Sequence, residues 1–241
     1  MKDKRLLILL PIIILGVFLI YKFFLNPKMN YIALGDSLAQ GINSYGEIGY
    51  SYTDYIAEAL EKKNLLESFS KEYPKSGYET YDVIKDIKTS TKLKKDLRES
   101  DLVTVSIGAN DFLSRIGKDS LTLDKIKNMK MVAIEILPSV DECIKEIRKY
   151  AKEDLIIVGY YNPIPFLFNT SQDEIDKLFA YIDDEYKKIA EKYDAGYISN
   201  YELFKVNKEF LPNPMDIHPS TKGYEAIANQ ILTEYLEKEK K

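Results

Sequence analysis

The stretch YIALGDSLAQG, residues 31–41, joins an apolar run to a short polar turn and then to the start of a helical segment. Residues 31–35 are apolar almost throughout, which is typical of a strand buried inside a sheet. Ser37 comes directly after this run, where the next helix begins. The stretch therefore predicts a strand and a helix joined in sequence, the building unit of an α/β fold.

The rest of the chain repeats this alternation of short apolar runs with longer amphipathic segments. The further predicted strands are 68–73, 101–108, 154–161 and 195–199. The first of these is the least apolar, so we expect it at an edge of the sheet. The predicted helices are 49–63, 79–88, 123–152, 171–193 and 220–241. Five strands alternating with helices imply a mostly parallel sheet covered on both faces, and we expect Pro138 to kink or divide the third helix.

Composition and charge exclude several classes of function. The 34 basic and 38 acidic residues are mixed along the 241-residue chain and give a net charge of −4, so nothing indicates a nucleic-acid partner. A single cysteine and a single histidine are too few for most zinc sites, and no EF-hand loop or P-loop occurs, so we predict no metal and no cofactor. Cys143 has apolar neighbours at helical spacing and is expected to be a small buried hydrophobe.

The amino-terminal segment differs from everything after it. Residues 6–25 are apolar apart from Lys22, which is long enough for one membrane-spanning helix. The basic residues within 1–5 favour a cytoplasmic amino terminus. We therefore expect a single-pass anchor at 6–25, a linker at 26–29 and one domain at 30–241 outside the cell membrane. The alternative is secretion after cleavage of a signal peptide, although no small-residue cleavage site follows the apolar run.

Four residues fall at the carboxyl ends of predicted strands or close to them, where ligands bind in open parallel sheets. Ser37 follows the first strand, Gly77 the second and Asn110 the third, while His218 precedes the last helix. Each alone has an ordinary explanation, because serine caps helices and glycine and asparagine are common in turns. Together they supply a hydroxyl, a base and donors for an oxyanion, which is the set that acyl transfer needs.

These motifs resemble those of the GDSL, or SGNH, esterases and lipases. GDSL stands at 35–38, Gly77 follows, GAND stands at 108–111 and IHP at 217–219, in the order of the family. The segment GYYNPIP at 159–165 also resembles one in bacterial lysophospholipase-like members. The resemblance spans nearly all of the chain after the apolar segment.

The resemblance implies a flavodoxin-like three-layer α/β/α sandwich, the SGNH hydrolase fold. It implies Ser37 as the nucleophile and His218 as the base. It also implies an oxyanion hole built from Ser37, Gly77 and Asn110. An α/β-hydrolase fold is the rival, because GDSLA is one residue from the G-x-S-x-G elbow, but in that fold several strands precede the elbow.

The acid of the expected triad departs from the family pattern. The acid usually stands three residues before the histidine, but Met215 occupies that position and the carboxylate is Asp216, two residues before. If the loop bends suitably around Pro214, Asp216 accepts the Nδ1 hydrogen bond of His218. Otherwise a backbone carbonyl orients the imidazole and the enzyme works as a dyad.

The ester substrate is less constrained than the reaction. The apolar segment 163–168 and the tyrosines Tyr45, Tyr50 and Tyr52 are candidates to line an acyl-chain pocket, which with the anchor favours a lipid or lysophospholipid ester. The anchor enters at the start of the first strand and Ser37 lies at its end, which instead suits a carbohydrate or cell-wall O-acetyl ester. A third alternative is a catalytically silent, membrane-anchored binding protein. The oligomeric state is left open.

Overall fold

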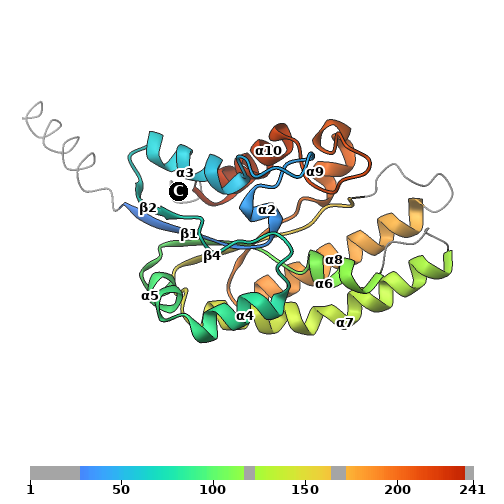
Figure 1. The fold of residues 1–241 in the computed structure, drawn as a ribbon, viewed down its shortest axis with the longest axis horizontal. Coiled ribbons are helices and arrows are strands. Elements are labelled where there is room, and N and C mark those ends of the chain that lie inside the picture. Colours follow the sequence, from blue (N-terminus) through green and yellow to red (C-terminus); the bar gives the residue numbers. More distant parts are fainter. Residues whose placement is uncertain (1–27, 117–122, 164–171, 237–241) are drawn as a thin grey trace, which may run out of the picture.

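The computed structural model describes residues 28–116, 123–163 and 172–236, which build one parallel sheet with helices on both faces (Figure 1). The strands are β1 (Met29–Gly35), β2 (Leu66–Ser70), β3 (Leu102–Ser106), β4 (Asp154–Val158) and β5 (Gly196–Ile198). Their order is β2-β1-β3-β4-β5, and each neighbouring pair is parallel. The predicted five-stranded sheet is confirmed, with the second strand at an edge. The chain leaves β1 for one edge and later returns to β3 on its other side, which creates a topological switch point between these two strands.

Helices cover both faces of the sheet and complete a three-layer sandwich (Figure 1). One layer holds α2 (Ser37–Gln40), α3 (Tyr52–Lys62), α9 (Tyr201–Val206) and α10 (Thr221–Ile231). The other holds α4 (Thr80–Thr89), α5 (Thr91–Glu99), α6 (Ala109–Ile116), α7 (Leu123–Arg148) and α8 (Gln172–Lys192). A 3-10 turn covers Lys208–Phe210, and a π-helical turn, Leu232–Leu236, extends α10.

Alternate strand residues divide between two apolar cores, one under each helix layer. On β1, Tyr31 belongs to the core that α3 and α10 cover, whereas Ile32 and Leu34 belong to the core beneath α4, α7 and α8. The period of two along a strand sends successive side chains to opposite faces, so a strand covered on both sides is apolar throughout. This is why the run 31–35 lacks polar alternation. Cys143, on α7, is fully buried in the second core, as predicted.

The structure differs from the predicted elements in four places. Helix α9 covers Tyr201–Val206, where no helix was predicted. Helix α5 was not predicted, because its only buried residues are Leu93 and Leu97, one turn apart in an otherwise charged segment. Helix α6 occupies Ala109–Ile116, a segment for which no helix was predicted. Pro138 does not divide α7, which continues from Leu123 to Arg148 as one helix. Proline removes one helical hydrogen bond, and packing of α7 on α4, α6 and α8 holds the helix together across that gap.

The expected anchor at residues 6–25 lies outside the described residues. Among the helices that the structure does describe, none combines the length and the apolar composition needed to cross a bilayer.

Candidate active site

Ser37 lies in a tight turn at the carboxyl end of β1. Gly35 has φ of +124°, and a Cβ there would come within 2.0 Å of the Ser106 carbonyl oxygen on β3, so only glycine fits. Asp36 caps α2, because its Oδ1 accepts a hydrogen bond from the Leu38 backbone N–H at 3.0 Å. These constraints place Ser37 in the first turn of α2, with its side chain at the carboxyl edge of the sheet.

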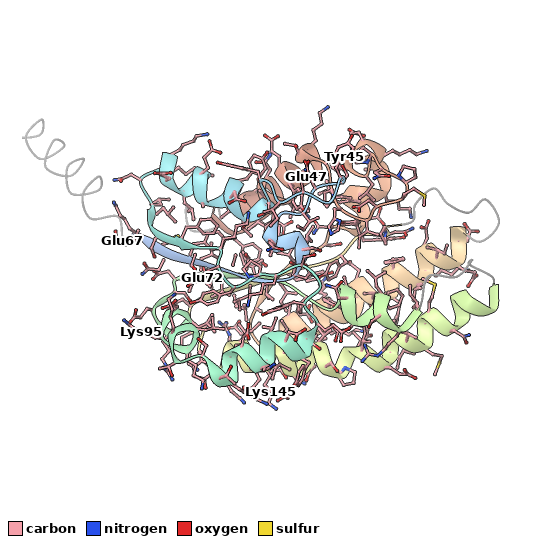
Figure 2. The ribbon with its side chains drawn as sticks, viewed as in Figure 1. Tyr45, Glu47, Glu67, Glu72, Lys95 and Lys145 are labelled. Carbon is pink, nitrogen blue, oxygen red and sulfur yellow. The ribbon has the colours of Figure 1, made fainter. Side chains whose placement is uncertain are left out.

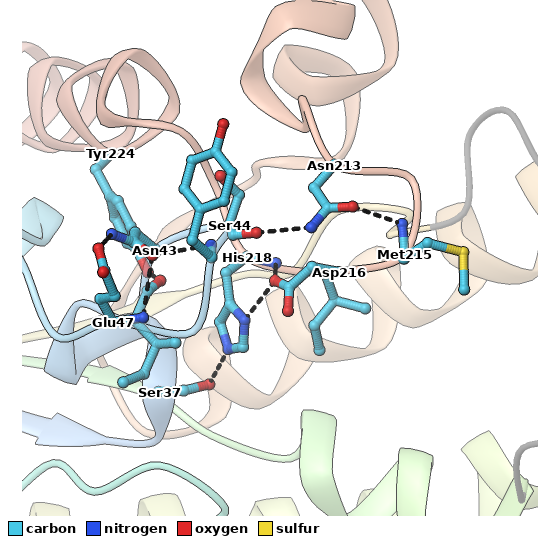
Figure 3. A network of polar contacts seen from close by, with 12 residues as sticks. Ser37, Asn43, Ser44, Glu47, Asn213, Met215, Asp216, His218 and Tyr224 are labelled. Atoms are coloured by element: carbon cyan, nitrogen blue, oxygen red, sulfur yellow. Dashed lines mark hydrogen bonds and ion pairs between the residues drawn. The ribbon is translucent and has the colours of Figure 1, made fainter.

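His218 lies between Ser37 and Asp216 in a continuous row (Figure 3). Its Nε2 is 2.8 Å from Ser37 Oγ, and its Nδ1 is 2.7 Å from Asp216 Oδ1. A carboxylate only accepts hydrogen bonds, so Nδ1 carries the proton and Nε2 accepts from the serine hydroxyl. This is the tautomer in which an imidazole can take the proton of an attacking hydroxyl.

The loop that carries the acid explains how a carboxylate two residues from the histidine can reach its ring. Asp216 Oδ1 also accepts the backbone N–H of His218 at 2.8 Å, so one oxygen binds both the main chain and the ring of the same residue. Asn213 holds the start of this loop, since its side-chain amide donates to the Ser44 carbonyl at 2.8 Å and its Oδ1 accepts from the Met215 N–H (Figure 3).

Asn110 reaches the same edge from the first turn of α6, following β3. It borders the cavity beside Ser37, and its Nδ2 donates to the Tyr78 carbonyl at 2.9 Å. Gly77, with φ of +84°, lies one residue before Tyr78 in an exposed turn, and it is not among the residues that line this cavity. Ser76 is held in turn, because its N–H donates to Gln40 Oε1 at 2.7 Å. The Gly77 turn is thus tied on one side to α2 and on the other to Asn110.

A buried carboxylate adjoins Ser37. Asp36 is only 1% exposed, and burial raises the pKa of its carboxyl to about 6. Hydrogen bonds from the Tyr160 hydroxyl, the Leu38 N–H and the Ser106 hydroxyl oppose this rise by stabilising the charged form. Neither the burial of Asp36 nor its contact with Tyr160 was predicted from the sequence, because the two residues lie 124 positions apart.

An apolar cavity opens beside the serine and histidine. About 680 Å³ of space free of protein atoms lies within it, including the open solvent at its mouth. Ser37, Asn110 and His218 stand at its polar end. Its apolar wall includes Leu38, Phe112, Leu113, Ile136, Phe179 and Ile182.

The residues expected to line an acyl pocket are mostly elsewhere. Tyr52 is the first residue of α3 and is fully buried, on the opposite face of the sheet from α6, α7 and α8. Tyr45 and Tyr50 are 80% and 58% exposed, and Tyr45 lies on the outer surface of the α2–α3 connection (Figure 2). None of these three candidates is among the residues that line the cavity. Pro163 does line the cavity, and residues 164–168 lie outside the described part of the chain.

A hydroxyl, an imidazole and a carboxylate in hydrogen-bonded sequence, at the carboxyl edge of a parallel sheet, define the class of serine-type acyl-transfer enzymes. Within that class, the chain belongs to the GDSL-like lipase/acylhydrolase family, which it matches over residues 33–226. It is therefore an esterase-type hydrolase of that family. The resemblance seen in the motifs is confirmed, and an α/β-hydrolase elbow does not account for the family match.

Similar proteins and structures share this fold at low identity. The spore germination lipase LipC of Bacillus licheniformis is 25% identical over 215 residues, covering 84% of this chain and 94% of the relative. A lipase from goat rumen metagenome, Lip_vut3, has a TM-score of 0.69 at 21% identity and covers 86% of this chain and 97% of that one. Axe2, an acetylxylan esterase of Geobacillus stearothermophilus, has a TM-score of 0.60 at 19% identity, covering 87% and 94%.

Proposed function

We propose that this chain hydrolyses carboxylic esters with apolar acyl groups, such as lipid or lysophospholipid esters, through an acyl-enzyme on Ser37. The observation that carries the proposal is the apolar cavity whose polar end is formed by Ser37, Asn110 and His218. An acyl chain placed in this cavity would bring its carbonyl carbon to the serine oxygen while its alkyl part leaves water.

The first half of the proposed reaction transfers one proton and forms one bond. Ser37 Oγ attacks the ester carbonyl as His218 Nε2 takes the hydroxyl proton, and Asp216 stabilises the imidazolium through Nδ1. Collapse of the tetrahedral intermediate breaks the bond to the alcohol, which leaves with the proton from Nε2. Water then repeats the sequence on the acyl-enzyme and releases the carboxylic acid.

Two of the proposed donors to the oxyanion border the cavity, the N–H of Ser37 and the side chain of Asn110. The resemblance to the family adds the N–H of Gly77, from the turn next to Tyr78 that does not line the cavity. An amide nitrogen carries two hydrogens, so Asn110 can donate one to the Tyr78 carbonyl and still offer the other to the cavity. Its bond to Tyr78 also fixes the turn that carries Gly77. A preorganised donor of this kind typically contributes about 2.7–4 kcal/mol to stabilising the transition state.

A series of p-nitrophenyl esters from acetate to palmitate tests the substrate class, alongside lysophosphatidylcholine and acetylated xylan. We expect kcat/KM to rise with acyl length beyond acetate, because each methylene buried in the cavity leaves water at a gain of about 0.8 kcal/mol. Ser37→Ala is the control and should be inactive on every ester. Preference for acetate and acetylated xylan over every longer chain would assign the enzyme to carbohydrate O-acetyl esters instead.

We further propose that residues 6–25 anchor the enzyme in the cell membrane with the amino terminus in the cytoplasm. The support is the length and composition of the apolar segment and the basic residues before it. β1 begins at Met29 and Ser37 follows its other end, so an anchor that precedes Met29 would join the domain at the end of β1 opposite to the cavity. Alkaline extraction of membranes tests this, since an anchored chain stays with the pellet and a secreted one appears in the medium.

A further inference from the structure

Two adjacent tyrosines after β4 donate hydrogen bonds to the segments that carry the two reacting side chains. The Tyr160 hydroxyl donates to Asp36 Oδ2, one residue before Ser37. The Tyr161 hydroxyl donates to the carbonyl of Ile217 at 2.6 Å, one residue before His218. Both tyrosines also border the cavity.

The backbone from which these tyrosines extend is fixed on both sides. The Gly159 N–H donates to the Ile198 carbonyl at 2.8 Å, and the Gly159 carbonyl accepts from the side chain of Asn200 at 2.7 Å. Asn200 is fully buried, and a Cβ at Gly159 would lie 2.3 Å from the Tyr197 hydroxyl. The segment therefore has little freedom to shift.

The tyrosine rings are held as firmly as their backbone. Tyr161 is 6% exposed and stacks on Phe204, with ring centroids 4.0 Å apart and an interplanar angle of 10°. Tyr160 meets the edge of Tyr186 at 6.3 Å. Two hydroxyls on one rigid segment consequently set the distance between the turn before Ser37 and the loop before His218.

We propose that Tyr160 and Tyr161 are positioning residues that set the alignment of Ser37 with His218. The proposal rests on the proposed acyl-enzyme mechanism. Ser37 and His218 lie 181 residues apart on separate elements, and their 2.8 Å contact is the one through which the proton moves. Away from the cavity, the side chains of Asn213 and Tyr224 donate to the carbonyls of Ser44 and Ile42, and so join the chain around His218 to the chain that follows Ser37. The two tyrosines complete the support from the cavity side.

Loss of the Tyr160 hydroxyl and loss of the Tyr161 hydroxyl leave different kinds of group without a donor. Without the Tyr160 hydroxyl, Asp36 loses a donor to its buried charge, so the pKa of its carboxyl rises further and it protonates at higher pH. Without the Tyr161 hydroxyl, a neutral carbonyl is released and the three donors to Asp36 remain. The titratable groups facing Asp36 are Tyr52, Tyr160, Tyr161, Tyr186, Tyr224 and His218.

The test compares Tyr160→Phe and Tyr161→Phe with wild type on one p-nitrophenyl ester, across a pH range. Both rings stay, so we expect KM to change little and kcat to fall about 10- to 100-fold, the scale of a small misalignment of reacting groups. Urea unfolding at pH 4 and pH 7 gives a second readout. Relative to wild type, Tyr160→Phe should lose stability from pH 4 to pH 7, because the buried Asp36 charge has lost a donor, whereas Tyr161→Phe should show no such change. Tyr193→Phe is the matched control, because it removes a hydroxyl bond to Asp141 away from the cavity.

The outcomes separate this proposal from the mechanism it rests on. If both variants keep wild-type kcat and pH dependence while Ser37→Ala is inactive, the positioning role is refuted and the mechanism stands. If Ser37→Ala retains turnover, the acyl-enzyme mechanism itself is refuted. Thermal melting of each variant accompanies the kinetics, and a kcat loss that is matched by the same loss of folded protein also refutes the positioning role.

Discussion

Replacing Asp36 with asparagine should change how the stability of the protein depends on pH. Asp36 is buried, and the pKa of its carboxyl rises from an ordinary value of 3.8 to about 6 in the folded protein. The folded state therefore binds this proton more tightly than the unfolded state does. Its contribution to stability is fully present below the unfolded pKa and is lost as pH rises through the folded one.

The size of the effect follows from the shift. The rise of the pKa from 3.8 to about 6 corresponds to about 3 kcal/mol, most of which develops between pH 7 and pH 4. The asparagine of the variant would be neutral at every pH and, like aspartate, a good helix cap for the Leu38 N–H. Relative to wild type, Asp36→Asn should therefore gain about 2 kcal/mol of stability at pH 7 compared with pH 4.

Urea unfolding of both proteins at pH 4, 5, 6 and 7 measures this difference. Comparing the two proteins cancels the other titrating groups, which both share. If the free energies of unfolding of the two proteins differ by the same amount at every pH from 4 to 7, Asp36 does not carry a raised pKa. If the variant instead loses stability relative to wild type as the pH rises, the fold stabilises the charge of Asp36.

Three further predictions concern the reaction. His218→Ala should lose as much ester turnover as Ser37→Ala, because the chain has no other histidine. A p-nitrophenyl ester assay measures both losses, and a clearly smaller loss in His218→Ala would contradict the prediction. Asp216→Ala should lower kcat clearly but about 10- to 100-fold less than either, as for the acid of other serine triads, and an unchanged kcat would mean another group orients the ring. Ile136→Trp fills the cavity wall, so the octanoate-to-acetate ratio of kcat/KM should fall about tenfold or more, and an unchanged ratio would place the acyl chain elsewhere.

The convergence of the candidate residues was predictable from the strands. Apolar runs at 31–35 and 101–108 identify buried parallel strands, and parallel strands bring their carboxyl ends to one edge. Ser37 and Asn110 follow strands that are neighbours in the sheet, so their proximity follows from the order of β1 and β3. His218 arrives from the connection before α10, and its position needed the motif as well as the pattern.

The cavity was not predictable in the same way, because its walls come from side chains far apart in sequence. Phe112, Ile136 and Phe179 belong to α6, α7 and α8 and pack in a small apolar cluster of their own. Apolar residues on an amphipathic helix appear the same in sequence whether they meet a neighbouring helix or border a cavity. The tyrosines near Ser37 appeared more suggestive, but α3 carries Tyr52 to the other face of the sheet.

The spacing of the acid shows why a motif can deviate without losing its geometry. What the imidazole requires is an acceptor near Nδ1, and a side chain reaches that atom by whatever backbone path the loop provides. In this loop the Asp216 carboxylate first accepts the N–H of His218, which folds the residue pair into a tight turn and leaves the same oxygen 2.7 Å from Nδ1. Just before this turn, Asn213 Oδ1 accepts the N–H of Met215 and so fixes the backbone that leads into it. The turn thus sets the distance from Asp216 Oδ1 to His218 Nδ1. An acid two residues before the histidine, instead of three, can make this contact because the hydrogen bond from the His218 N–H brings its carboxylate close to the ring.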